Sequence, residues 1–124
     1  MKILVLCAYG QNRSRYLAEY LATKGFETDF DGVKNEDKET VQAKIAWADA
    51  VIAVTHDIHE KALASFDFTG KKVFALDVDD RPQKGFLSLP ILTGDEWVEF
   101  QAQYVYPKLI EQANKILNLD LNRK

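Results

Sequence analysis

Short apolar runs alternate with helical patterns along most of this chain, and this alternation limits the folds that it can adopt. Runs at residues 2–6, 50–54 and 72–76 have the length and apolar character of buried strands. Residues 26–30 alternate apolar and polar side chains, as a half-exposed strand does. Segments with helical spacing lie between these runs. Strands that alternate with helices predict an α/β domain with a mostly parallel sheet.

Three helices are expected between the predicted strands. The first covers about residues 14–24 and is followed by Gly25, a residue typical of a helix C-terminus. The second follows the polar connection 34–37, and the third begins near residue 55 and ends near Ser65. The side chains that we expect the second and third helices to bury are Val41, Ile45, Trp47, Leu63 and Phe66.

One further helical region is predicted after residue 94. Asp95 is a candidate N-cap for it. The core side chains expected from its helical spacing are Trp97, Phe100 and Tyr104. Pro107 has no amide N–H to donate, so the helix must kink or start again there. The helical pattern continues over residues 109–117, and the tail 119–124 is expected to fray.

The length and composition predict one domain that covers residues 1–124. A net charge of −3 and a pI near 5.4 argue against general nucleic-acid binding. No apolar run approaches the roughly 20 residues that span a bilayer, and residues 1–6 are too short for a signal-peptide core. A single cysteine cannot form an internal disulfide. We therefore expect a cytoplasmic protein with no nucleic-acid or membrane partner, while the sequence does not indicate an oligomeric state.

The single cysteine, Cys7, lies where the first predicted strand ends and the first helix begins. The five residues between Cys7 and Arg13 can curl so that their amides converge on one point. The following helix adds the positive end of its dipole at the same place. Such a site binds a phosphoryl group and favours the thiolate form of a cysteine. The residues of this predicted phosphate-binding loop are Ala8, Tyr9, Gly10, Gln11, Asn12 and Arg13.

The residue types around this loop fit nucleophilic attack on phosphorus. Cys7 is the candidate nucleophile, and the planar guanidinium group of Arg13 can bind two phosphoryl oxygens. Gly10 permits a positive φ or a close backbone approach. The hydroxyl group of Ser14 can hydrogen-bond the thiolate and ease its departure from a phosphocysteine. The alternative is a buried strand-end cysteine followed by ordinary first-turn residues, because cysteine is among the most buried residue types.

The strand, the Cys-x5-Arg-Ser loop and the helix together resemble the low-molecular-weight protein tyrosine phosphatase family. Segments 25–29, 48–56 and 71–80 extend the resemblance to its small bacterial branch of predicted protein tyrosine phosphatases. The resemblance implies a three-layer α/β fold with four parallel strands in the order 2-1-3-4 and helices on both faces. It also implies a metal-independent phosphatase without a cofactor, which hydrolyses phosphate monoesters through a phosphocysteine on Cys7. The implied partner is a phosphorylated substrate, either a phosphotyrosine protein or a small phosphate monoester.

The resemblance also assigns catalytic roles to individual residues. It makes Arg13 the phosphate ligand and Ser14 the partner of the thiolate. The general acid of the family is an aspartate in the loop after the fourth strand, which protonates the leaving oxygen and then activates water. A comparison without gaps gives Asp80 this role, and a gap of one residue gives it to Asp79. The alternative is a solvated acidic turn, with the acid elsewhere or absent.

The loop departs from the family pattern at its second and third positions. The family has Gly and Asn there, whereas this chain has Tyr9 and Gly10. The Asn that braces the loop is therefore absent, and Asn12 is a candidate replacement. Arg81 and Pro82 follow the acidic residues where the family has Pro and often two tyrosines, so Tyr9 becomes the candidate to line the pocket mouth. These changes preserve the phosphate chemistry and weaken the expectation of a phosphotyrosine preference.

Three other functions use the same loop. The pattern Cys-Ala-x-Gly resembles the cysteine-phosphorylated B component of sugar phosphotransferase systems, which would make the chain a phosphocarrier. Arg13 argues against a carrier, which typically has a small hydroxyl residue at that position. An arsenate reductase needs resolving cysteines, and this chain has only Cys7. A non-catalytic phosphate-binding module would use Arg13 without needing a cysteine or an acid.

His56 and His59 lie three residues apart and raise the question of a metal site. A zinc site usually has three or four protein ligands, drawn mostly from His and Cys. No further His or Cys lies near this pair in the sequence. We therefore expect both histidines at the surface or at a helix start, and no metal site.

Overall fold

The computed structural model describes residues 1–78 and 94–121 and separates into two compact units, residues 1–77 and residues 78–124. The first unit contains the sheet and the Cys7 loop, and the second is helical over its described residues from 94 to 121. Within the described residues, no helix combines the length and the apolar character needed to cross a bilayer. The expectation of one domain over the whole chain stays a prediction.

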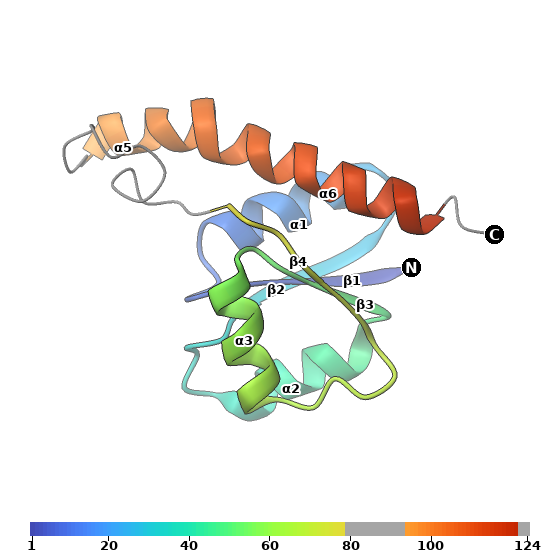
Figure 1. The fold of residues 1–124 in the computed structure, drawn as a ribbon. Helices are drawn as coiled ribbons and strands as arrows, with labels where there is room; N and C mark the ends of the chain where they lie inside the picture. Colours follow the sequence, from blue (N-terminus) through green and yellow to red (C-terminus); the bar gives the residue numbers. More distant parts are fainter. Residues whose placement is uncertain (79–93, 122–124) are drawn as a thin grey trace. The chain divides into compact units, whose positions relative to one another are not determined.

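A parallel four-stranded sheet forms the centre of the first unit (Figure 1). Its strands are β1 (Lys2–Cys7), β2 (Glu27–Gly32), β3 (Ala50–Ala53) and β4 (Lys72–Ala75). They are arranged in the order β2-β1-β3-β4, and every neighbouring pair is parallel. The predicted strand order 2-1-3-4 is therefore confirmed.

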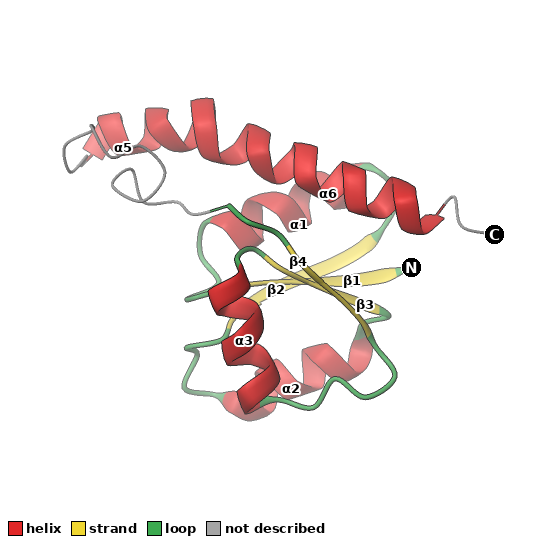
Figure 2. Ribbon diagram, viewed as in Figure 1, coloured by secondary structure: helices red, strands yellow, loops and turns green. Residues whose placement is uncertain are grey.

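Helices cover both faces of this sheet, as Figure 2 shows. Helix α1 (Arg13–Thr23) lies on one face and contacts β1 and β2. On the other face, α2 (Lys38–Trp47) contacts β1 and β2, and α3 (His56–Ser65) contacts β3 and β4. The three-layer α/β fold expected from the sequence is confirmed.

The core of the first unit is built around β1 at the centre of the sheet. Every residue from Ile3 to Leu6 is 0% exposed, because helices cover both faces of the strand. Leu17 and Leu21 of α1 are also fully buried, and they lie one helical turn apart. The strand before the Cys7 loop and the helix after it are therefore both anchored in the core.

Two of the expected core side chains are exposed. Trp47 is 37% exposed at the end of α2, and the Nζ atom of Lys2 lies 5.9 Å from the centre of its ring. Leu63 is 51% exposed, because α3 buries the adjacent Ala62 together with Ile58, one turn earlier. The predictions for Val41 and Ile45 are confirmed, whereas those for Trp47 and Leu63 are wrong. Phe66 is only partly buried.

The second unit contains α5 (Gly94–Phe100), a π-helical segment η1 (Gln101–Val105) and α6 (Tyr106–Leu121). The backbone stays helical into α6, with αR angles at Phe100 and Tyr106, and α6 starts at Tyr106, directly before Pro107. A new helical element therefore begins at this proline, which is one of the two predicted outcomes, and the missing N–H of proline accounts for the change. Helix α5 starts at Gly94, which places Asp95 inside its first turn instead of at the N-cap.

The burial of the aromatic residues in this unit differs from the prediction in one case. Phe100 is 4% exposed, but Tyr104 is 45% exposed, and their ring centres lie 5.4 Å apart. Trp97 is partly buried. The tail is helical to Leu121, and residues 122–124 lie outside the described part of the chain.

Candidate active site

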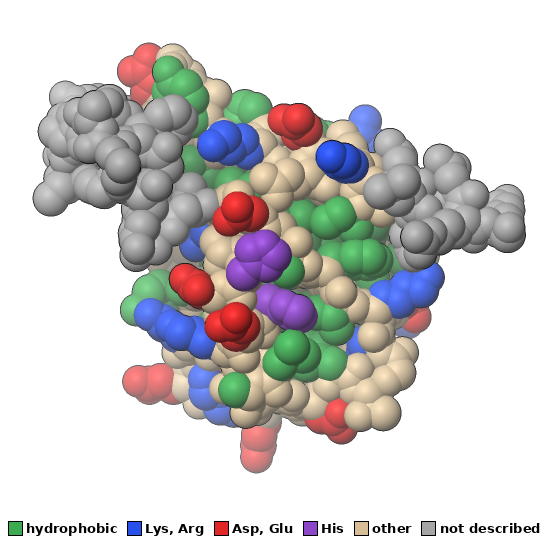
Figure 3. Space-filling model, in the orientation of Figure 1, with side chains coloured by type: hydrophobic (Ala, Val, Ile, Leu, Met, Phe, Trp, Pro, Cys, Tyr) green, Lys and Arg blue, Asp and Glu red, His purple; other side chains and the backbone are tan. Residues whose placement is uncertain are grey.

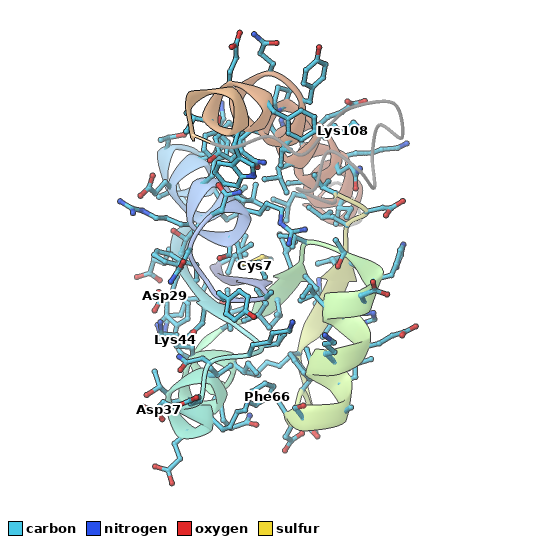
Figure 4. All side chains as sticks on the ribbon, turned by 90° about the vertical axis from the view of Figure 1, so that its left-hand side faces the viewer. Cys7, Asp29, Asp37, Lys44, Phe66 and Lys108 are labelled. Carbon is cyan, nitrogen blue, oxygen red and sulfur yellow. The ribbon has the colours of Figure 1, made fainter. Side chains whose placement is uncertain are left out.

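The segment between β1 and α1 forms a loop at the carboxyl edge of the sheet. Cys7 is the last residue of β1, and Arg13 is the first residue of α1. Figure 4 shows Cys7 at this edge, beside the start of α1. The structure therefore places the predicted loop residues 8–13 directly between the candidate nucleophile and a helix N-terminus.

Cys7 is buried, and its sulfur atom is held by hydrogen bonds. The side chain of Ser14 lies with its Oγ atom 3.0 Å from Cys7 Sγ. The amide of Gly10 donates to the same sulfur atom over 3.1 Å. Cys7 is 5% exposed and Ser14 is 0% exposed. The predicted pairing of Ser14 with the thiol is therefore present in the structure.

These contacts lower the pKa of Cys7 below its ordinary value of 9.0. Burial is the largest single effect and acts in the opposite direction, because it disfavours the charged thiolate. The Ser14 hydroxyl and the amides of Ser14, Gly10 and Gln11 together outweigh it by hydrogen-bonding the sulfur. The loop therefore favours the thiolate, which is the nucleophilic form of cysteine.

The loop approaches β2 through two glycines. Gly10 has φ +72°, and a Cβ atom on it would lie 2.8 Å from the backbone nitrogen of Gly32. A Cβ atom on Gly32 would lie 2.4 Å from the carbonyl carbon of Tyr9. Neither position has room for a side chain, so the glycine at the third loop position is required by this packing.

Residues that follow β2 hydrogen-bond to backbone carbonyl groups at the start of the loop. The amide of Val33 donates to the carbonyl oxygen of Cys7, and the amide of Lys34 donates to that of Ala8, each over 2.9 Å. These two bonds continue the strand pairing of β1 and β2, in which Cys7 lies opposite Gly32. The loop is thus fixed by backbone groups on its β2 side.

Asp31, near the end of β2, is a site residue that the sequence analysis did not predict. It is 8% exposed, and its carboxylate accepts hydrogen bonds from Gly32 N (2.7 Å) and Asn35 Nδ2 (3.0 Å). Lys44 Nζ lies 3.2 Å from its other oxygen. The sequence signal that could have found it is a carboxylate followed by glycine at the end of the strand beside β1.

Arg13, Asn12 and Tyr9 complete the loop. Arg13 is 8% exposed at the start of α1, where the positive end of the helix dipole lies. Asn12 precedes the helix without a side-chain capping bond, and its carbonyl accepts from the amide of Tyr16. Tyr9 is 65% exposed, and Lys34 Nζ lies 5.3 Å from the centre of its ring. Tyr9 is therefore a surface residue, whereas most other residues of the loop are partly or fully buried.

Comparison with known proteins finds a similar solved structure. No family model matches this chain, and no curated protein matches it. A low-molecular-weight protein tyrosine phosphatase from Bacillus subtilis, solved in solution, matches with a TM-score of 0.59 and 18% identity. The match covers 98% of this chain and 100% of that chain. The fold is that of a low-molecular-weight protein tyrosine phosphatase.

The candidates for the general acid, Asp80 and Asp79, both lie outside the described residues. The same is true of Arg81 and Pro82. The structure does describe the end of β4, where the amide of Leu76 donates to the carbonyl of Ala53. Because the sheet is parallel, β4 ends at the same edge as β1. The assignment of the acid stays a prediction.

The two histidines lie next to each other on the surface in Figure 3, with acidic side chains nearby. His56 starts α3 and is exposed, and His59 is partly buried one turn later. Over residues 1–78 and 94–121, the structure has no group of three or more His, Cys, Asp or Glu side chains that could hold a metal ion. The Cys7 loop lies in a separate segment, before α1.

Proposed function

We propose that this protein is a cysteine-dependent phosphatase that hydrolyses phosphate monoesters through a phosphocysteine on Cys7. The observation that carries the proposal is the environment of the Cys7 sulfur, which the Gly10 amide and the Ser14 side chain hold at 3.1 and 3.0 Å. These groups favour a thiolate at the N-terminus of α1, where a phosphoryl anion is also favoured. The chemistry that we propose uses neither a metal nor a cofactor.

In the first step, the loop amides and Arg13 would bind the phosphoryl oxygens while the thiolate attacks phosphorus. The new S–P bond forms as the bond from phosphorus to the ester oxygen breaks. That oxygen takes a proton from the general acid, for which Asp80 and Asp79 are the candidates. The alcohol or phenol then leaves, and Cys7 carries the phosphoryl group.

In the second step, water attacks the phosphocysteine. The carboxylate left by the first step accepts a proton from this water, the S–P bond breaks, and orthophosphate is released. The departing sulfur returns as a thiolate, which the hydroxyl of Ser14 stabilises by hydrogen bonding. The enzyme is then restored without any net change in its protonation.

The proposed substrates are a phosphotyrosine protein or a small phosphate monoester. The similar solved protein is described as a protein tyrosine phosphatase, which supports an aryl phosphate. The exposed ring of Tyr9, one residue from the amide that binds the sulfur, gives this chain an aromatic surface at the loop. A cytoplasmic location and one domain over residues 1–124 remain part of the proposal.

Hydrolysis of p-nitrophenyl phosphate tests this function. A phosphatase should release many equivalents of orthophosphate for each protein molecule. Stoichiometric labelling of Cys7 without turnover would instead identify a phosphocarrier. Binding of phosphate with neither labelling nor turnover would identify a non-catalytic module, and either result would contradict the proposal.

A further inference from the structure

The turn segment, residues 31–35, comprises the last two residues of β2 and the turn that follows them, and it binds the Cys7 loop from the β2 side. Its Val33 and Lys34 amides bond the carbonyl oxygens of Cys7 and Ala8. Across a planar trans peptide, the C=O and the following N–H point in opposite directions. Carbonyl oxygens held toward this turn therefore direct the N–H groups of Ala8 and Tyr9 away from β2. The turn thus influences which way the loop amides face.

Asp31 stabilises this turn segment through hydrogen bonds to its side chain. Its carboxylate accepts from Gly32 N at 2.7 Å and from Asn35 Nδ2 at 3.0 Å, which are the second and last residues of the turn. The amide of Asn35 also donates to the carbonyl of Gly32 over 3.0 Å. One side chain therefore ties together both ends of the segment that supports the loop.

The carboxylate of Asp31 is itself held in place. Lys44 Nζ lies 3.2 Å from Asp31 Oδ2 and donates to the carbonyl of Phe30 over 3.0 Å. Figure 4 shows Lys44 beside Asp29, whose partly exposed carboxylate lies 3.5 Å from the same ammonium group. A buried carboxylate with two neutral donors and one ammonium partner is well satisfied, and its position is therefore fixed.

We infer that Asp31 is a positioning residue for Cys7, in place of a bracing side chain inside the loop. Asp31 acts through Gly32, Val33 and Lys34, which contact the loop with their backbones. It has no proposed contact with substrate. The inference rests on the proposed function only for its consequences on turnover, because the ionisation of Cys7 can be measured without any substrate.

The pH dependence of Cys7 alkylation by iodoacetamide tests this role, since Cys7 is the only cysteine in the chain. In Asp31→Ala the midpoint of alkylation should move up by about one pH unit, because Gly10, whose backbone packs against Asp31 and Gly32, loses the alignment of its amide on the sulfur. Removal of a negative charge alone would move the midpoint down, so the sign separates positioning from charge. With p-nitrophenyl phosphate, kcat should fall about tenfold while KM changes less than about twofold.

Two variants serve as controls. Asp31→Asn keeps an oxygen that can accept from Gly32 and Asn35, and it should restore most of the wild-type profile. Asp29→Ala removes the other carboxylate beside Lys44 and should leave both the alkylation midpoint and kcat unchanged. An unchanged or lowered midpoint in Asp31→Ala, or an equal effect in Asp29→Ala, would overturn the inference.

If Asp31→Ala does not fold, Asn35→Ala gives the same test in a milder form. It removes one donor to the carboxylate and should raise the alkylation midpoint by a smaller amount; no rise would again overturn the inference. The two proposals fail separately. Absence of turnover in the wild type, with alkylation that depends on Asp31, would reject only the phosphatase. Wild-type turnover with alkylation and kcat unaffected in these variants would reject only the positioning role.

Discussion

Gly10 and Gly32 pack their backbones so closely that a Cβ atom on Gly10 would lie 2.8 Å from the amide nitrogen of Gly32. This contact joins the middle of the Cys7 loop to the end of β2, the strand next to β1. It gives the third position of the loop, Gly10, a close backbone contact with the neighbouring strand. The same contact leaves no room at residue 10 for even the Cβ atom of an alanine.

Gly10→Ala should therefore destabilise the protein more than an alanine at another glycine with positive φ. Gly70 is the matched control, because its φ is +78° and, among the described residues, a Cβ atom on it would meet no neighbour within 4 Å. Gly70→Ala should cost about 1–2 kcal/mol from backbone strain alone. Gly10→Ala should cost at least about 1 kcal/mol more, because backbone atoms must move. Urea unfolding measures both values, and equal losses would contradict the role of the contact.

Ser14→Ala should raise the pKa of Cys7. Burial raises this pKa and the Ser14 side chain is the largest factor that lowers it, so removal of the hydroxyl leaves burial less opposed. Alkylation of Cys7 should then require a higher pH for its half-maximal rate than in the wild type. Ser65→Ala, at the exposed end of α3, is the control and should leave the profile unchanged. An unshifted profile in Ser14→Ala would show that the hydrogen bond does not stabilise the thiolate.

Asp37 should contribute to stability in a way that depends on pH. Its side chain accepts from the amide and the hydroxyl of Thr40 at the start of α2, and the Thr40 side chain and then its amide are the main causes that lower the pKa of Asp37 below 3.8. A carboxylate with a lowered folded-state pKa adds stability above its unfolded-state pKa, and the gain is lost as the pH falls through the folded-state value.

Thermal melts of the wild type and Asp37→Ala should therefore differ near neutral pH, and the difference should shrink as the pH falls through the folded-state pKa of Asp37, which lies below 3.8. Asp37→Ser keeps a neutral N-cap, so its difference from Asp37→Ala should vary much less with pH. A gap between the wild type and Asp37→Ala that persists unchanged in acid would contradict this account of the α2 N-terminus.

The general acid can be identified with leaving groups of different basicity. A poor leaving group needs its oxygen protonated, so loss of the true acid should lower kcat by about 100-fold or more for an alkyl phosphate. The loss should be much smaller for p-nitrophenyl phosphate. Asp80→Asn and Asp79→Asn are each other's controls, and we expect Asp80→Asn to show the difference. Equal losses for both substrates in both variants would reject both residues.

The fold could be predicted largely from the sequence because its signals are local. The apolar runs at residues 2–6 and 50–54 have the pattern of strands covered on both faces, and their order then followed from the family resemblance. The Cys7 loop is also a local signal, since its nucleophile, arginine and serine lie within one short segment. The prediction for Trp47 failed because helical spacing does not show where a helix stops facing the core.

The support of the loop could not be predicted, because it depends on contacts between distant segments. Strand β2 continues past Phe30, where its alternation of side chains gives no further signal, so that Asp31 and Gly32 pair with Leu6 and Cys7. The ion-pair partner of Asp31 is Lys44, which lies in a later helix. Neither relationship is visible until the register of the two strands is known.

Mass spectrometry of the intact protein, quenched during hydrolysis of p-nitrophenyl phosphate, tests the central claim most directly. The wild type should carry one phosphoryl group on Cys7 while orthophosphate accumulates over many turnovers. Cys7→Ser should carry no phosphoryl group at residue 7 and should not turn over substrate. It should still fold, because Ser and Cys are similar in size. Turnover retained by Cys7→Ser would contradict the phosphocysteine mechanism.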